Sequence, residues 1–103
     1  MNVKSVTVTF SPASKFTLNS SYCEVSVNTA HLHLDVNYTG SGDSSAYVGS
    51  ITGYRPFRQT GGTIQARFEG FTYITYDGKI YLYANSSITS ATSYPLDFIY
   101  LLD

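Results

Sequence analysis

The sequence is poor in charge. Only 13% of its 103 residues are charged, and six Lys and Arg against seven Asp and Glu give a net charge of -1 at pH 7. The six basic residues are scattered along the chain. Nucleic acid and anionic membranes are bound by clusters of Lys and Arg, so we predict neither as a partner. Neutral surfaces, glycans and other protein chains remain as possible partners.

Cysteine, tryptophan and long apolar runs are also scarce. Cys23 is the single cysteine, so no disulfide can form within the chain, and the alternation of residues 23–27 predicts that it is a small buried residue. No apolar stretch of about 18 residues and no basic leader is present, so we expect neither membrane insertion nor secretion. A strand pattern begins at Val3, which favours the C-terminal part of a longer protein with Met1 added, and a short natural protein stays open as the alternative.

Aromatic residues and strand patterns are abundant. Ten Tyr and six Phe accompany a hydrophobic content of 43%, which is typical of a folded β protein. Short alternating segments are separated by turn residues, and no stretch has a helical period. We predict one domain over residues 1–103, an all-β antiparallel sandwich or Greek-key barrel of eight to nine short strands. The main expected strands are residues 3–10, 22–27, 31–38, 46–51, 63–69, 71–76, 79–84 and 96–102.

Residues 71–84 form the clearest predicted hairpin. Asp77 and Gly78 suit a two-residue type I′ turn, because both central positions of that turn need positive φ. Such a turn pairs Ile74 with Tyr81. Alternation then places one set of large side chains on the same face: Ile74, Tyr76, Tyr81 and Tyr83. This face is not polar, so a second sheet, another copy of the chain or a ligand is expected to cover it.

The two histidines lie on the polar side of one expected strand. His31, His33 and Asp35 alternate with apolar residues, and the strand repeat separates the two imidazoles by roughly 6.5 to 7 Å. Zinc needs three or four ligands that converge within about 2.0 to 2.3 Å, and Asp35 lies one step further along the strand. We therefore predict no metal site. A solvated polar face and a contact with a ligand or subunit both stay open.

Motifs typical of enzymes are absent. The sequence has no Gly-x-Ser-x-Gly motif, and its seven carboxylates show no spacing that indicates an acid/base pair. The glycines of residues 40–42 and 61–62 do not precede a helical pattern, as those of a phosphate-binding loop do. We predict no enzymatic activity and no cofactor.

Three segments resemble a known family. Residues 51–56 read Ile-Thr-Gly-Tyr-Arg-Pro, residues 76–81 read Tyr-Asp-Gly-Lys-Ile-Tyr, and residues 98–100 read Phe-Ile-Tyr. In this order they resemble the C-terminal head domains of bacteriophage receptor-binding proteins, which lie on the tail tips and baseplates of phages of Gram-positive bacteria. The resemblance covers residues 46–103. The chain departs from the family in Thr52, where a proline often precedes the glycine, and in its lack of Trp.

The resemblance implies a compact antiparallel β domain that forms a homotrimer and recognises a bacterial cell-wall polysaccharide or another surface glycan. It also implies a place in the virion, at the tail tip or baseplate, after synthesis in the host cytoplasm, and contact with other tail proteins through a preceding part of the chain. The aromatic hairpin face is then expected to be the contact between subunits, through Ile74, Tyr76, Tyr81 and Tyr83.

Ligand contacts are expected from loops and polar strand faces that carry hydrogen-bonding groups near rings. The candidates are His31, His33, Asp35, Asp43, Tyr47 and Arg58. Arg58 beside Asp43 and Tyr47 would suffice for a saccharide. Two alternative functions stay open: a structural tip or decoration protein of a virion without a receptor, and a monomeric lectin-like module whose aromatic face is the platform.

Overall fold

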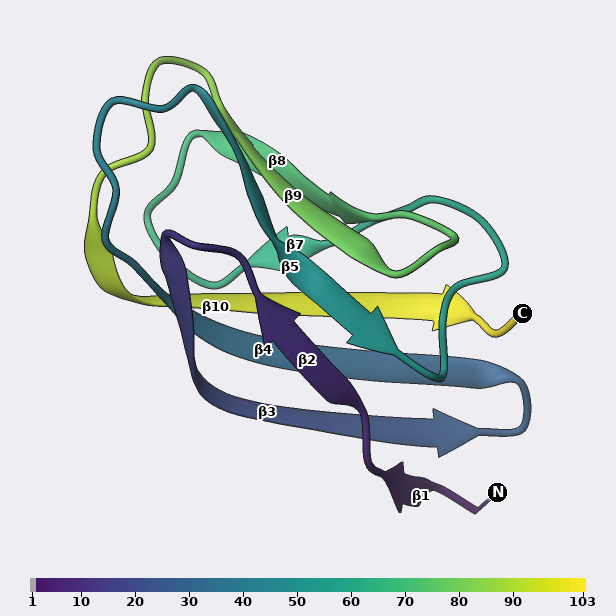
Figure 1. The fold of residues 1–103 in the computed structure, drawn as a ribbon. Helices are drawn as coiled ribbons and strands as arrows, with labels where there is room; N and C mark the ends of the chain where they lie inside the picture. Colours follow the sequence, from purple (N-terminus) through teal and green to yellow (C-terminus); the bar gives the residue numbers. More distant parts are fainter. Residues whose placement is uncertain (1) are drawn as a thin grey trace.

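The structure is a computed structural model that describes residues 2–103, and the expectation about Met1 lies outside these residues. Ten strands form two antiparallel sheets of five strands each, which pack as a sandwich (Figure 1). The predicted all-β antiparallel fold is confirmed, with ten strands in place of eight to nine. Within residues 2–103, no helix is long and apolar enough to cross a membrane.

Sheet A holds the long strands. Its order is β1 (Lys4–Val6), β3 (Phe16–Ser26), β4 (Thr29–Tyr38), β10 (Ala91–Leu101) and β7 (Thr63–Ile64). Sheet B faces it. Its order is β2 (Thr9–Pro12), β5 (Ser45–Thr52), β9 (Lys79–Ala84), β8 (Gly70–Ile74) and β6 (Thr60–Gly61).

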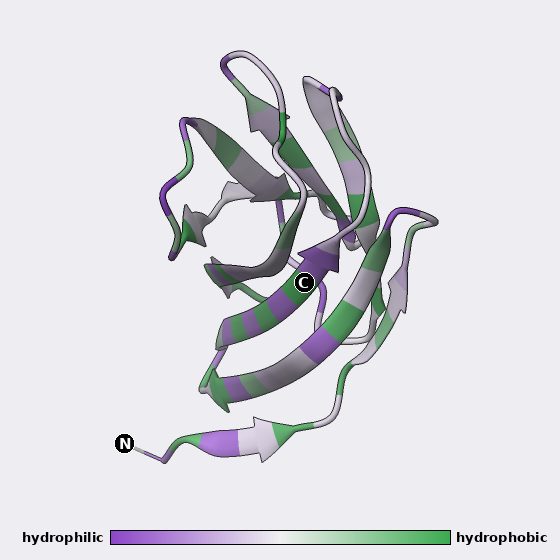
Figure 2. Cartoon of the chain, turned by 90° about the vertical axis from the view of Figure 1, so that its left-hand side faces the viewer, coloured by the Kyte–Doolittle hydropathy of each residue, from purple (hydrophilic) through white to green (hydrophobic). Residues whose placement is uncertain are grey.

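The core lies between the two sheets and follows from alternation along the strands. Hydrophobic and hydrophilic residues alternate along the long strands (Figure 2). Strand β4 is the clearest case, because every second residue is buried: Ala30, Leu32, Leu34, Val36 and Tyr38. Burial of Cys23 among these residues confirms its predicted place in the core.

The N-terminal region differs from the prediction. Residues 3–10 are not one strand, because the chain crosses from sheet A to sheet B at Thr7 and Val8. Residues 16–21, expected in a loop, extend β3 to 11 residues and pair with β4 up to Tyr38. The polar composition of this segment does not predict a strand. The strand forms because β4 supplies the backbone pairing, and local composition does not reveal such a neighbour.

The expected strand over residues 63–69 is also shorter. Only Thr63 and Ile64 pair with β10, opposite Asp97 and Leu96, and Gln65 then donates its N–H to the Pro95 carbonyl at 2.8 Å. The alternation that predicted a full strand therefore continues into irregular chain before β8 begins at Gly70.

The hairpin of β8 and β9 is present, but its predicted register is wrong. Thr75 N–H donates to the Lys79 carbonyl at 2.8 Å, so Thr75 and Lys79 close a loop of three residues and not two. Gly78, with φ of +85°, supplies the left-handed position that closes a three-residue loop. A Cβ at Gly78 would also lie 2.7 Å from the Ile51 carbonyl oxygen.

This shift changes which side chains share a face, because a slip of one residue turns a strand over. Tyr73 now pairs with Tyr81, Phe71 with Tyr83, and Ile74 with Ile80. The inner face of the hairpin carries three apolar residues and one threonine, and all four are buried: Thr72, Ile74, Ile80 and Leu82. The placement of Ile74 on a surface with Tyr81 and Tyr83 is therefore wrong. Tyr76 lies in the turn and is 69% exposed.

Candidate functional site

The outer face of sheet B carries five aromatic rings on three neighbouring strands. Strand β5 contributes Tyr47, β8 contributes Phe71 and Tyr73, and β9 contributes Tyr81 and Tyr83. Cross-strand pairing puts them in two rows, since Tyr47, Tyr81 and Tyr73 are opposite one another and Tyr83 is opposite Phe71. We call these five residues the aromatic grid.

The rings of the aromatic grid contact their neighbours without a gap. Centroids lie 5.4 Å apart for Tyr47 and Tyr81, 5.3 Å for Tyr81 and Tyr73, 5.8 Å for Tyr73 and Tyr83, and 5.1 Å for Tyr83 and Phe71. These distances are typical of stacked or tilted aromatic pairs. Phe71 is 56% exposed and Tyr47 is 41% exposed, while the rings between them are half-buried. One continuous aromatic surface therefore faces solvent.

The hydroxyl groups of the grid add polar sites. Tyr73 donates to the Tyr83 hydroxyl over 3.5 Å, and this contact together with burial raises the pKa of Tyr73 to about 12. The grid thus combines ring faces with hydroxyl donors and acceptors, which is the combination that orients a ligand on an aromatic surface.

A pocket of about 240 Å³ lies at the Tyr47 end of the grid. Its lining residues include Lys15, Asp43 and Tyr47. Lys15 Nζ lies 2.9 Å from Asp43 Oδ2, and Tyr38 donates its hydroxyl to the same carboxylate. The hydrogen bond from Tyr38 and the ammonium of Lys15 hold the pKa of Asp43 below its usual value. The Asp43 carboxylate therefore stays charged and able to accept hydrogen bonds.

The predicted group of Asp43, Tyr47 and Arg58 forms only in part. Asp43 and Tyr47 line one pocket, as expected, but Arg58 Cζ lies 5.6 Å from the centroid of the Phe57 ring instead. The cation beside Asp43 is Lys15. The sequence does not predict the pair of Lys15 and Asp43, because the two residues are 28 positions apart. In addition, Lys15 directly precedes a part of β3 that has no strand pattern in the sequence.

The outer face of sheet A carries a different cluster. His31 Nε2 and His33 Nδ1 each lie 2.9 Å from Asp97 Oδ1. A carboxylate only accepts, so both imidazoles donate to it. Burial would raise the pKa of Asp97, but the hydrogen bonds from the two imidazoles outweigh it and hold that pKa below its usual value. The Tyr22 ring stacks on His33 with centroids 4.8 Å apart.

Asp35 is not a member of this cluster. Its Oδ1 accepts from the Ser93 hydroxyl at 2.7 Å and from the Asn19 amide at 3.4 Å. Sequence reasoning missed Asp97 because its contact depends on the pairing of β4 with β10, which places Asp97 opposite His33. Among the residues that the structure describes, no group of three His, Cys, Asp or Glu side chains is arranged to hold a metal ion.

The three segments that resemble phage head domains meet in space. Tyr100, in the last strand, donates its hydroxyl to the Tyr54 carbonyl at 2.7 Å, and Pro56 pairs with Leu102. The hairpin turn joins them, because Ile51 N–H donates to the Gly78 carbonyl at 2.9 Å. Residues 51–56, 76–81 and 98–100 thus form one contiguous region. Tyr54 there has a φ of +49°, which is uncommon for a residue with a side chain.

Comparisons of the chain with protein-family models, with curated proteins and with solved structures find no match.

Proposed function

We propose that the chain is a receptor-binding head domain of a bacteriophage tail and that the aromatic grid, with the pocket beside it, binds a saccharide of the bacterial surface. The observation that carries this proposal is the unbroken row of rings that ends at a charged pocket. Tyr47 belongs to both the grid and the pocket, so a ligand that stacks on the rings also reaches Lys15 and Asp43.

The chemistry of the surface favours a glycan over a charged polymer. Sugar rings have apolar faces that stack on aromatic side chains and hydroxyl groups that exchange hydrogen bonds. The grid offers ring faces and Tyr hydroxyls, and the pocket offers one ammonium and one carboxylate that largely neutralise each other at 2.9 Å. A net charge of -1 supplies no attraction for polyanions.

The association with phage rests on the sequence resemblance of residues 46–103. The contact of its three segments in one region supports it, because residues 51–56 form hydrogen bonds both with the hairpin turn and with the last strand. A place at the virion tail tip or baseplate, contact with other tail proteins, and assembly as a homotrimer belong to the same proposal. Linking several weak sites on one particle raises avidity by about 10² to 10⁴.

A titration tests this function. Polysaccharide fragments from the walls of a panel of Gram-positive bacteria are added to the 103-residue chain, and heat is measured. We expect saturable binding to at least one fragment. Tyr81→Ala removes the ring shared by both neighbouring strands, and loss of about 1.4 kcal/mol in stacking weakens binding about tenfold. Tyr76→Ala is the matched control, since Tyr76 lies outside the grid, in the turn. Absence of binding across the panel, or equal binding by both variants, contradicts the proposal.

A second candidate is an assembly role in which sister chains cover the grid. The exposed Phe71 ring favours it, because Phe71 has no polar atom and large exposed apolar surfaces mark contacts. Both candidates include association of the chain, so sedimentation and saccharide titration of Phe71→Ser are needed together to separate them. Association that Phe71→Ser abolishes, without saccharide binding, supports the assembly role. Saccharide binding by a chain whose grid remains accessible supports the receptor-binding role.

A further inference from the structure

The sandwich is open along the side where β2 is the outer strand of sheet B and the short β1 is the outer strand of sheet A, next to β3. Strand β1 pairs only with the end of β3, opposite residues 23–25, before the chain crosses to sheet B. Figure 1 shows the first half of β3 along the border of the molecule, with β1 beside its other end only. As a result, six consecutive residues of β3, 17–22, are exposed.

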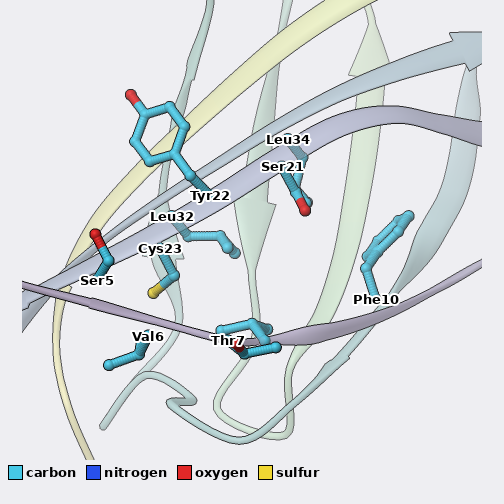
Figure 3. A pocket seen from close by; sticks show the side chains of 10 residues that line it. Ser5, Val6, Thr7, Phe10, Ser21, Tyr22, Cys23, Leu32 and Leu34 are labelled. Atoms are coloured by element: carbon cyan, nitrogen blue, oxygen red, sulfur yellow. The ribbon is translucent and has the colours of Figure 1, made fainter.

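A cavity of about 230 Å³ lies where the exposed half of β3 meets the part that pairs with β1, and Tyr22 and Cys23 of β3 line it (Figure 3). The crossing segment with Thr7 and Phe10 forms one wall, and Leu32 and Leu34 of the core lie at its base. Ser21, which is exposed, also lines it. A cavity of about 150 Å³ takes benzene, so this one has room for an apolar side chain.

Unpaired backbone groups lie along the same side. Backbone groups of a strand point alternately to its two neighbours. Thr39 N–H donates to the Lys15 carbonyl at 2.9 Å, so the groups of Leu18, three residues on, point away from β4. A bulge between Leu18 and Ser20 shifts the alternation by one. Beyond it the groups of Ser21 point to the open side, as do those of Cys23, which is paired to Val6 of β1.

We infer that this open side binds an extended peptide strand that carries an apolar side chain. The strand continues the line of β1 along β3, pairs with the backbone of Leu18 and Ser21, and places its apolar side chain in the cavity. Addition of a strand to a sheet edge draws affinity from main-chain hydrogen bonds and specificity from pockets for alternate side chains. Both features are present here, because Ser21 has free main-chain groups and also lines the cavity.

The composition of the edge agrees with this partner. Proteins that keep an edge strand from pairing commonly place Lys, other charges or Pro on it. Residues 16–22 read Phe-Thr-Leu-Asn-Ser-Ser-Tyr, with no charge and no proline. Cys23, which follows this segment and pairs with Val6 of β1, is buried, in contrast to residues 17–22. The site is independent of the aromatic grid, which lies on the outer face of sheet B.

The test uses the full chain and three soluble peptides. Acetylated and amidated Thr-Val-Thr-Xaa-Thr-Val, with Leu, Phe or Asp as Xaa, is titrated into the ¹⁵N-labelled chain, and amide shifts are followed by NMR. Shifts are expected at residues 16–23 and 32–34. Burial of Leu or Phe is worth about 1.5 to 3 kcal/mol, so these peptides should bind at least about tenfold more tightly than the Asp peptide.

Two variants and a control locate the site. Leu18→Pro removes a backbone donor on the open side and leaves the ladder with β4 intact, because proline is tolerated on edge strands. Ser21→Phe fills the mouth of the cavity. Both should weaken the Leu peptide at least tenfold, whereas Ser86→Phe, which adds the same ring to an exposed loop, should not. Absence of shifts with all peptides, shifts that neither variant changes, or a cavity that takes benzene while the peptides stay unbound overturns the inference.

Discussion

The outer faces of the two sheets differ in how their outward side chains are paired. On sheet A the outward His31 and His33 have a partner within the chain, because both donate to Asp97. On sheet B the outward rings stack on one another, and Phe71 and Tyr47 at the ends of this surface are exposed to solvent. A face whose polar groups are already paired gains little from a ligand. The face that exposes a continuous aromatic surface is the one that can bind a ligand.

The largest expected effect is on the free energy of unfolding, when a substitution on the inner face of the hairpin is compared with one at its exposed turn. Ile74→Ala should lower the free energy of unfolding by about 2 to 5 kcal/mol, because Ile74 is fully buried and its truncation leaves a cavity. Tyr76→Ala, at the exposed turn, should stay within about 0.5 kcal/mol. Urea unfolding measures both. Equal effects would contradict the three-residue turn and the register that it sets.

Acid unfolding probes the face of sheet A. The pKa of Asp97 is lowered in the folded chain, so its stabilising effect is present above the unfolded value of about 3.9 and is lost as the pH falls through the lower folded value. Asp97→Asn should cost about 1 kcal/mol at neutral pH. The stability curves of the two proteins should converge below about pH 3.9. A difference that stays constant with pH would show that the imidazoles do not act on this carboxylate.

Saccharide binding probes the pocket at the edge of sheet B. Lys15→Gln removes the ammonium beside Asp43 but leaves an amide donor, and the affinity for a bound saccharide should fall by a few-fold. Lys4→Gln is the matched control, since Lys4 lies on β1 of the other sheet. Isothermal titration measures the difference. Unchanged affinity in the Lys15 variant would limit the binding site to the rings.

The smallest expected effect concerns hydroxyl groups within the aromatic grid. Tyr83→Phe removes the acceptor for the Tyr73 hydroxyl, so the pKa of Tyr73 should move from about 12 toward its ordinary value of 10. Ultraviolet absorbance of phenolate against pH follows this change. If the remaining tyrosines titrate in the variant as they do in the unaltered chain, the hydroxyls of Tyr73 and Tyr83 do not interact.

The sequence predicted those features that depend on a single strand. Alternation along β4 needs no knowledge of its neighbours, and the apolar residues that alternate with His31, His33 and Asp35 are buried, as is Cys23, which the sequence predicted to be buried. The all-β antiparallel class followed in the same way. Turn chemistry was less certain, because Asp77-Gly78 suits both a two-residue and a three-residue loop, and only the longer one forms.

Features that depend on pairing between distant segments could not be predicted. Asp97 and His33 are 64 positions apart, and Lys15 and Asp43 are 28 apart. No local pattern shows that their strands or loops meet. The aromatic grid was predicted only in part, since the sequence places Tyr81 and Tyr83 together on one face. Of its other members, Phe71 and Tyr73 join them through the register of β8 with β9, and Tyr47 joins them through the pairing of β5 with β9.

Chemical-shift mapping with a bound saccharide tests the central claim most directly. The ¹³C-labelled chain is titrated with the wall fragment that gives the strongest heat, and the ring signals of Tyr and His are followed. We predict shifts in the rings of Tyr47, Tyr73, Tyr81 and Tyr83 and none in those of His31 and His33. Shifts in the histidine rings with the grid unchanged would contradict the assignment of binding to sheet B.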